Sequence, residues 1–213
     1  MMGIALLAST GMAILSGCAK DPLNNLTEEE SRIYITNRDS TVNFASYKTY
    51  SISDSVYVID NNTLASRENT NWDQSALAAV RNAMEQKGYI RVSPGQSPDL
   101  GINVSRLYNT TTNVVDFSDY YGGYGGYYDP YYWGYGGYSY YDPTYYGPTF
   151  YSTYQVTQGA LSIDMLNLKD AVNGNTIRPV WSALSRGTGV FNPATIDIQV
   201  NALFEQSPYL STK

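Results

Sequence analysis

The sequence predicts a single α+β domain, in which a mixed β-sheet carries two amphipathic helices on one face. Two segments, 72–87 and the stretch after Asn192, repeat apolar residues at helical spacing. Other segments alternate apolar and polar residues or concentrate β-branched and aromatic ones, as strands do. Helices and strands that each have one apolar side bury those sides best as two packed layers.

The first seventeen residues predict a signal peptide. The run from Ile4 to Leu15 is apolar or small, and it is too short to cross a bilayer as a helix. It fits the apolar core of a secretory signal, although Met1-Met2-Gly3 carries no Lys or Arg. The run ends in Leu15-Ser16-Gly17-Cys18, which resembles the lipobox of bacterial lipoproteins. We therefore expect cleavage between Gly17 and Cys18 and lipid attachment at Cys18.

Composition restricts the remaining chemistry. Cys18 is the only cysteine and the chain has no histidine, so no internal disulfide forms and the commonest general base and metal ligand is missing. The net charge of −6 argues against a nucleic-acid partner. We expect no catalytic residue, no metal and no cofactor. Attachment to a membrane would come from the acyl chains on Cys18.

The position after the cysteine predicts the location. It is Ala19 rather than the aspartate that usually retains lipoproteins in the inner membrane. We therefore expect an outer-membrane anchor, with the periplasmic and the surface-exposed face left open. Residues 18–31 are predicted to be a polar tether and 32–213 the domain.

The elements before residue 110 follow from local patterns. Residues 42–52 (VNFASYKTYSI) read as a strand, which Ser55 to Ile59 could extend or pair with. The helix at 72–87 has Asn71 or Asp73 as its cap and Gly88 as its stop. Residues 100–105 alternate apolar with Gly, Asn and Ser, which predicts a strand with one buried face.

The later elements form a hairpin and a helix. Residues 159–168 predict a strand, Asn173-Gly174 a tight turn, and 180–186 the partner strand. Asn192-Pro193 then begins a helix that ends before Pro208. The expected order is strand, helix, strand, insertion, hairpin, helix.

An ordered set of short motifs resembles a known family. The motifs are FASYKTY at 44–50, KGY at 87–89, PDL at 98–100, GALSID at 159–164 and VW at 180–181. In this order they are similar to the bacterial lipoprotein domain-of-unknown-function family numbered 4136, over about 42–208. Ser182-Ala183 and Pro179 depart from its pattern. The family has no established activity, so the resemblance implies a fold and a location but no chemistry.

Residues 118–154 form a Tyr/Gly-rich insertion. It holds 15 of the 22 tyrosines, and no Lys or Arg occurs between Leu107 and Leu168. Three interpretations stay open: a low-complexity spacer, an aromatic recognition surface for a glycan or an envelope protein, and a loop that covers the open face of its own sheet. The candidate binding residues are Tyr127, Tyr128, Tyr131, Tyr132, Trp133, Tyr140, Tyr141, Tyr145 and Tyr146.

Three weaker candidates remain. Asp164 and Asp170 could form the carboxylate pair of a glycoside hydrolase, but the simpler interpretation makes Asp164 an exposed strand residue and Asp170 part of a turn. Ser40 and Ser55 lie in Asp-Ser motifs typical of O-glycosylation acceptors in some Gram-negative phyla. The sequence leaves the oligomeric state open.

These observations predict a non-enzymatic outer-membrane lipoprotein that acts through interaction. The alternatives are a carboxylate-based enzyme on envelope glycans and an assembly accessory of an envelope complex.

Overall fold

The computed structural model describes residues 26–61, 63–108, 110–116, 132–135, 139–140, 151–156 and 159–213. Side chains are described in these ranges except at 63, 110–116, 139–140 and 151–156. The expected lipid-attachment residue Cys18, its neighbour Gly17 and most of the Tyr/Gly-rich insertion lie outside the described residues.

The chain alternates strands with short and long helices. The strands are β1 (Ile33–Arg38), β2 (Thr49–Ile52), β3 (Val56–Asp60), β4 (Thr63–Glu68), β5 (Ile90–Arg91), β6 (Leu100–Tyr108), β7 (Thr110–Asp116), β8 (Ser139–Tyr140), β9 (Tyr151–Val156), β10 (Ala160–Asn167) and β11 (Thr176–Arg186). The α-helices are α1 (Asn71–Gln86), α4 (Ala171–Gly174) and α5 (Ile196–Glu205), and 3₁₀ turns occupy Phe44–Ser46, Pro94–Gln96 and Pro193–Thr195.

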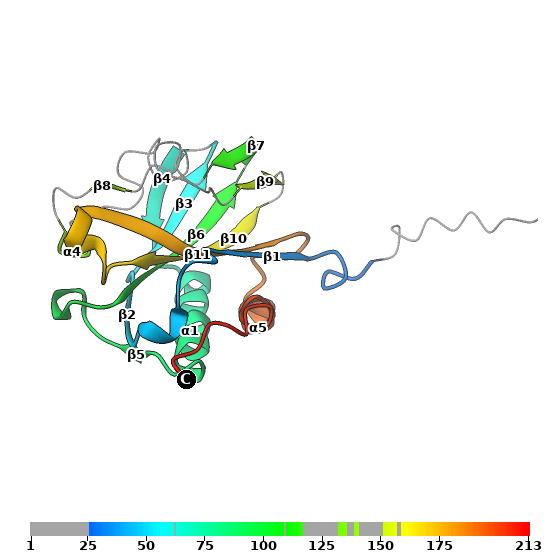
Figure 1. Cartoon of the computed structure of the whole chain (residues 1–213). Coiled ribbons are helices and arrows are strands. Elements are labelled where there is room, and N and C mark those ends of the chain that lie inside the picture. The colour runs from blue at the N-terminus through cyan, green and yellow to red at the C-terminus, as the bar shows by residue number, and fades with distance from the viewer. Residues whose placement is uncertain are drawn as a thin grey trace, which may run out of the picture.

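The described strands form a nine-stranded mixed sheet and a separate two-stranded ribbon. The main order is β1-β11-β10-β6-β2-β5, and β3 also pairs with β6 and with β4. Strands β2 and β3 follow one another along the same edge of β6, opposite Leu100–Ile102 and Ser105–Tyr108 respectively. The β7–β9 ribbon lies on the side of the sheet opposite the helices (Figure 1).

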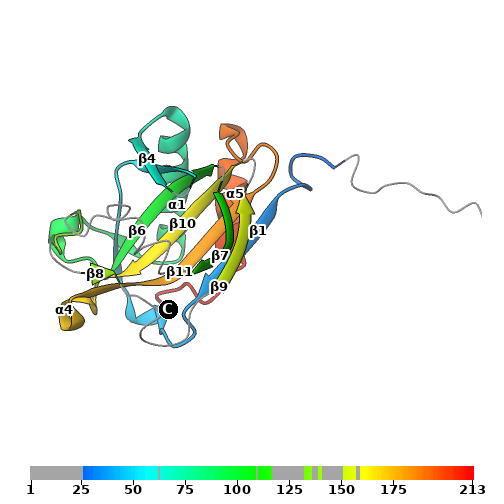
Figure 2. The ribbon, with the colours of Figure 1, turned by 90° about the horizontal axis from the view of Figure 1, so that it is seen from above.

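Helices α1 and α5 cover one face of the sheet, as the sequence predicts. Figure 2 shows β6, β10, β11 and β1 side by side with both helices beneath them. The first core, between helices and sheet, takes one apolar row from each central strand. Its members include Leu77, Val80, Ile102, Val104, Leu161, Ile163, Met165, Trp181, Val200 and Leu203. The α+β class and the helix-covered face are therefore confirmed.

The other face of the sheet is also buried, which corrects the expectation that 100–105 has a single buried face. A second core covers this face; its members are Tyr57, Ile59, Leu107, Trp133, Ala160, Leu166, Leu168, Ala171, Ile177 and Leu184. Trp133 is 2 % exposed, and its ring lies so close to Gly101 that a β-carbon there would stand 3.1 Å from Cε2. A side chain in place of this glycine in β6 would press on the indole ring, which would have to move by a few tenths of an ångström.

The hairpin of β10 and β11 is confirmed, with one change in its turn. The connection contains the short helix α4, and Asn175 after it adopts the left-handed conformation at φ 50°. The register shifts between Met165 and Leu166, so that Leu166 pairs with Pro179. Proline lacks the N–H that a regular ladder needs, and this irregularity accommodates it.

The N-terminal third differs most from the expected order. Four strands precede α1 rather than one, and β1 and β4 are not expected from the sequence. Residues 42–48 are not a strand: Asn43 caps a 3₁₀ turn by accepting a hydrogen bond from the Ala45 N–H. Only the end of the predicted 42–52 strand, as β2, joins the sheet.

Candidate functional site

A cavity of about 510 Å³ lies where β1 ends and the β10–α4–β11 turn begins. Its lining is mainly polar and includes Asp39, Asn43, Tyr47, Asn167, Asp170 and Arg178. Two connections form it: the segment that leaves β1, and the turn between β10 and β11. Both β1 and β10 pair antiparallel with β11, so they run in the same direction. Their C-terminal ends therefore lie at the same end of the sheet.

Both pocket carboxylates are held by hydrogen bonds through one oxygen. Asp39 Oδ1 accepts from the backbone N–H of Thr41 at 2.8 Å and from its hydroxyl at 2.5 Å. Asp170 Oδ2 accepts from Asn167 Nδ2 at 2.7 Å, while the Asp170 N–H donates to Asn167 Oδ1 at 3.1 Å. The second oxygen of each carboxylate has no partner among the described residues, so each carboxylate is oriented and can still accept a hydrogen bond from a ligand.

Tyr47 provides a protonated hydroxyl beside these carboxylates. The side chain is 2 % exposed. Burial raises the pKa of Tyr47, and the negative charges of Asp170, Asp39 and Asp99 raise it further. The hydroxyl therefore stays protonated at physiological pH and remains a potential donor.

Two cationic side chains lie at or near the pocket. Arg178 lines the cavity. Lys169 donates a 2.7 Å hydrogen bond from Nζ to the carbonyl oxygen of Ser46, another lining residue, and lies 6.0 Å from the centre of the Tyr47 ring. The pocket thus combines hydrogen-bond acceptors and donors.

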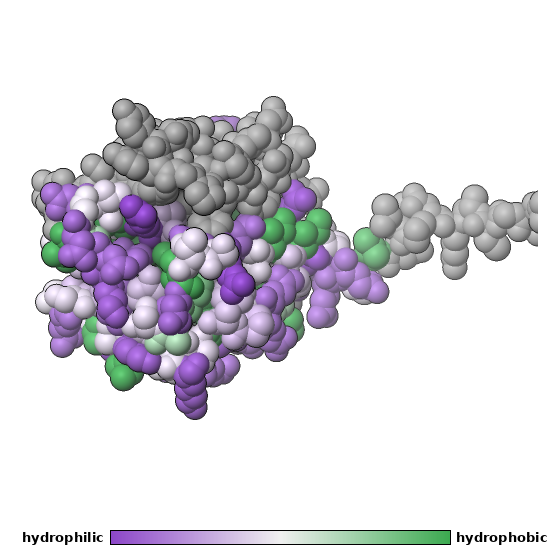
Figure 3. Space-filling model, in the orientation of Figure 1, coloured by the Kyte–Doolittle hydropathy of each residue, from purple (hydrophilic) through white to green (hydrophobic). Residues whose placement is uncertain are grey.

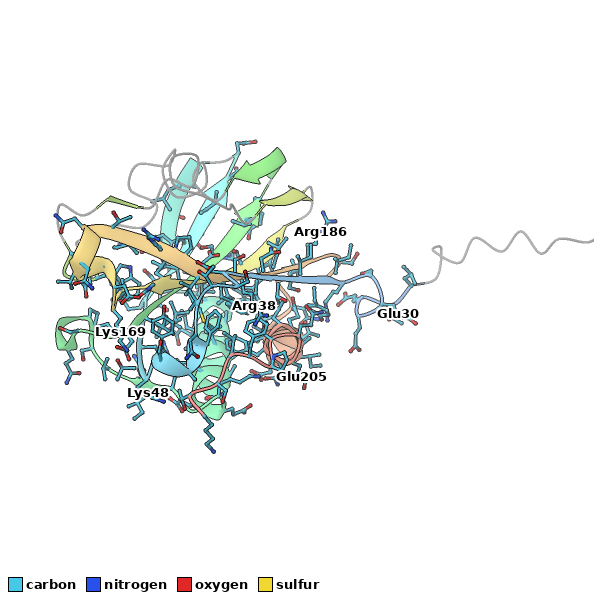
Figure 4. All side chains as sticks on the ribbon, viewed as in Figure 1. Glu30, Arg38, Lys48, Lys169, Arg186 and Glu205 are labelled. Atoms are coloured by element: carbon cyan, nitrogen blue, oxygen red, sulfur yellow. The ribbon has the colours of Figure 1, made fainter. Side chains whose placement is uncertain are left out.

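The pocket lies at the end of β1 opposite the segment predicted to be the tether. The tether enters this strand at Ile33, whereas Asp39 directly follows its last residue, Arg38. Six residues of strand separate the two ends by roughly 17 Å. Figure 4 shows the same arrangement, with Lys169 on the pocket side of the domain and Glu30 on the tether side.

The structure does not bring Asp164 and Asp170 together in this pocket. Asp170 lies in the turn as expected and precedes α4. Asp164 is 1 % exposed rather than exposed, because the second face of β10 is covered. There it stands opposite Asn103 of β6 and Ser182 of β11, and its Oδ2 accepts a 3.3 Å hydrogen bond from the Ser162 hydroxyl.

The described aromatic residues of the insertion pack onto the sheet. Trp133 belongs to the second core, so its ring is not open to a ligand. The Tyr132 hydroxyl accepts from the Asp54 N–H at 3.1 Å and donates to the Ile52 carbonyl at 3.3 Å. The Tyr135 hydroxyl donates to the Leu168 carbonyl at 3.2 Å. At residues 132–135, the insertion therefore covers the face of its own sheet.

The remaining tyrosine candidates are described only in part. Tyr140 lies in β8, which pairs with β11 at Thr176 and Ile177, and Thr176 lines the pocket. The backbone of the insertion therefore passes the pocket rim. The other candidates, Tyr127, Tyr128, Tyr131, Tyr141, Tyr145 and Tyr146, lie outside the described residues.

The two candidate glycosylation serines differ in exposure. Ser40 is exposed on the turn beside the pocket residue Asp39, whereas Ser55 is half-buried in the bend before β3. A glycan on Ser40 would stand at the pocket mouth.

Neither a metal cluster nor a membrane-spanning helix occurs within the described ranges. These residues contain no group of three or more His, Cys, Asp or Glu side chains arranged to hold a metal. No helix among them has the length and hydropathy needed to cross a bilayer.

Sequence reasoning identified Asp170 but missed the pocket. Asp39 appeared only as part of a glycosylation motif. Asn43 and Tyr47 appeared only as members of the predicted 42–52 strand, with Tyr47 also in the FASYKTY motif, and Arg178 carried no recognised signal. The pocket could have been predicted from two polar segments, Asp-Ser-Thr at 39–41 and Asn-Leu-Lys-Asp at 167–170, each of which lies at the end of a strand. This prediction needs β1 to be recognised as a strand, and its sequence does not indicate one.

These features define a two-layer α+β domain whose sheet is covered by two helices on one side and by a second apolar core on the other. The chain belongs to the family described as domain of unknown function DUF4136, whose model matches residues 35–209.

A solved DUF4136 family protein from Bacteroides thetaiotaomicron VPI-5482 is 29% identical, with a TM-score of 0.68 over 86% of this chain and 99% of that one. A PelC dodecamer from Paraburkholderia phytofirmans is 11% identical, covering 85% of this chain and 99% of that one at a TM-score of 0.41. A PDZ domain protein from Parabacteroides distasonis ATCC 8503 is 14% identical, covering 84% of this chain and 36% of that one at a TM-score of 0.39. No match is found among curated proteins.

Proposed function

We propose that this protein is an outer-membrane lipoprotein, anchored through Cys18, that acts by binding a polar ligand rather than by catalysis. The pocket at the far end of β1 carries this proposal. It presents two carboxylates, each held in place by hydrogen bonds to one of its two oxygens, and a protonated tyrosine hydroxyl. All three groups lie at the end of the domain opposite the tether. A domain attached to a membrane at its tether end would hold this pocket away from the lipid.

The chemistry of the lining favours a ligand rich in hydroxyl groups, such as an envelope glycan. Carboxylate oxygens accept hydrogen bonds, and the Asn43 and Asn173 side-chain amides both donate and accept. A saccharide presents neighbouring hydroxyls that both donate and accept, which matches this mixture. The guanidinium of Arg178 adds a charged donor at the same wall.

The anchor is tested by replacing the only thiol. We expect Cys18→Ser to abolish metabolic labelling with a fatty acid and to release the protein from the membrane fraction. Retention of Cys18→Ser in the membrane pellet after a high-salt wash would refute the lipid anchor.

The pocket is tested with paired variants against a panel of oligosaccharides from bacterial envelopes. Asp39→Asn and Asp170→Asn each keep a side-chain oxygen but lose the charge. A hydrogen bond to a charged group contributes about 1.5–3 kcal/mol, so each variant should bind roughly 10- to 100-fold more weakly in titration calorimetry.

The matched control for these variants is Asp197→Asn, on α5 away from the pocket, which should leave affinity unchanged. Equal affinity of the pocket variants and the control would show that saccharides bind elsewhere on the protein.

One observation favours the enzymatic alternative: Asp39 and Asp170 line the same cavity. Glycoside hydrolases use two carboxylates that flank the scissile bond. We expect no release of reducing ends from peptidoglycan or polysaccharide substrates. Turnover that disappears in Asp170→Asn would replace the binding proposal by a hydrolytic one.

A further inference from the structure

Five large apolar side chains are exposed among the described residues, and they fall into two groups. Leu26, Ile33 and Ile198 are 43, 46 and 48% exposed. Ile90 and Val172 are 64 and 60% exposed and belong to β5 and α4, at the pocket end of the sheet. The first group belongs to the tether end, where apolar surface is visible beside the departing chain (Figure 3).

Contacts between the tether and the domain bring the first group to one end of the molecule. Arg32 Nη2 lies 3.6 Å from Glu28 Oε2 and donates a 3.4 Å hydrogen bond to the Gly189 carbonyl. Gly187 approaches the Ser31 carbonyl so closely that a β-carbon there would stand 2.6 Å from it. The loop that contains both glycines leads into α5, which packs against β1. Residues 27–32 are thus docked between Leu26 and Ile33, next to the start of the helix that carries Ile198.

The chain between this docked turn and Cys18 is short. Eight peptide steps separate Cys18 from Leu26, and a fully extended chain of that length spans at most about 29 Å. The tether end of the domain is therefore confined close to the bilayer whenever Cys18 is acylated.

We propose that the tether end is a membrane-contact face, with Leu26, Ile33 and Ile198 inserted among the lipid headgroups. The proposal rests on the lipid anchor proposed above and adds an orientation to it. Attachment through Cys18 holds the face beside the bilayer, so a modest apolar area suffices for contact.

The charges at this end specify the lipid. Glu28 is paired with Arg32, and Glu30 is held by the N–H and hydroxyl of Thr27, which lower its pKa. Glu29 and Asp197 add further negative charge, and Arg186, the residue opposite Ile33 in β11, adds one positive charge. This acidic balance predicts contact with a zwitterionic lipid surface and weaker contact with an anionic one.

The single cysteine makes the orientation measurable. In the acylated protein the Cys18 thiol is occupied, so an introduced cysteine is the only free thiol. Ile33→Cys and Ile198→Cys report on the proposed face, and Ile90→Cys and Val172→Cys are controls of equal or greater exposure. Each acylated variant is labelled with a fluorophore and reconstituted into phosphatidylcholine vesicles that carry a spin-labelled quencher lipid.

We expect quenching at least threefold stronger at 33 and 198 than at 90 and 172, and weaker quenching at 33 and 198 when half the lipid is phosphatidylglycerol. Equal quenching at all four sites, with the protein bound to the vesicles, would overturn the contact face and leave the lipid anchor intact. Failure of the acylated protein to float with vesicles would instead refute the anchor itself.

Discussion

Tyr50 and Tyr89 place their hydroxyls in the interior of the domain. Tyr50 is fully buried and donates to the Arg81 carbonyl at 3.4 Å. Tyr89 is 2 % exposed and donates to the Phe44 carbonyl at 3.5 Å. Burial raises the pKa of each to about 12, with Glu85 contributing at Tyr50. Both phenols must stay protonated for the domain to keep this packing.

These shifts predict alkaline destabilisation. A phenol with a folded pKa of about 12 and an unfolded pKa of about 10 stabilises the fold fully below pH 10, and this stability is lost as the pH rises toward 12. The free energy of unfolding should fall by about 1.4 kcal/mol per pH unit for each of the two groups over this interval. Urea unfolding at pH 9, 10 and 11 measures the slope. In Tyr89→Phe the slope should be shallower, and an unchanged slope would contradict the assignment.

At the scale of the element, the start of α1 combines a cap with an ion pair. Thr70 and Asp73 form a capping box: the Asp73 carboxylate accepts from the Thr70 N–H at 2.7 Å, and the Thr70 hydroxyl accepts from the Asp73 N–H at 3.4 Å. Asp73 is fully buried and its Oδ1 lies 3.1 Å from Arg106 Nε in β6. The first turn is thereby joined to the sheet.

Loss of the cap should therefore be measurable. We expect Thr70→Ala to lower the free energy of unfolding by about 1 kcal/mol, since one N–H of the first turn loses its acceptor. Gln74→Ala, at an exposed position one turn on, should change it by less than about 0.5 kcal/mol. Equal effects in urea denaturation would show that the Asp73–Arg106 pair alone holds the helix start.

Individual elements were predictable where local pattern and packing agree. The apolar positions of α1 and the alternation in β10 correspond to rows of the first core, so both were found. Strand β1 could not be found in this way. Among the described strands it pairs only with β11, and its residues are mostly half-buried, so they carry no alternation. Phe44 and Tyr47 suggested a strand because aromatic residues favour strands, but the Asn43 cap directs the backbone into a turn.

At the scale of the whole molecule, the sheet is enclosed by two cores. The first was predictable from helix and strand periodicity. The second could be given only as one of three open interpretations of the insertion, because Trp133 lies within a Tyr/Gly-rich stretch that has no periodicity. The pocket was missed for a related reason, since its walls come from segments more than a hundred residues apart. The sequence did contain a signal for the second core: Ile59, Leu107 and Leu184 are apolar residues on the face opposite the helices, and apolar residues there must be covered.

Removal of the indole ring tests whether the second core supports the fold. We expect Trp133→Ala to lower the free energy of unfolding by about 3–5 kcal/mol, as for other buried large aromatic residues. Tyr135→Phe, which removes only the hydroxyl bound to Leu168, should cost about 1 kcal/mol. A Trp133→Ala protein as stable as the wild type would mean that the insertion rests on the sheet without stabilising it.

The pairing of β1 with β11 has a consequence for the order of folding. Ile33 lies opposite Arg186, so β1 cannot enter the sheet until β11, about 150 residues later in the chain, has been made. Contacts this distant in sequence form slowly, because a long loop must close before any of them is gained. In the lipoprotein proposed above, which would emerge N-terminus first from a translocation channel, Cys18 would become available for acylation well before β11 emerges. Such a chain would be attached to the bilayer before β1 pairs with β11, and it would complete its fold at the membrane surface.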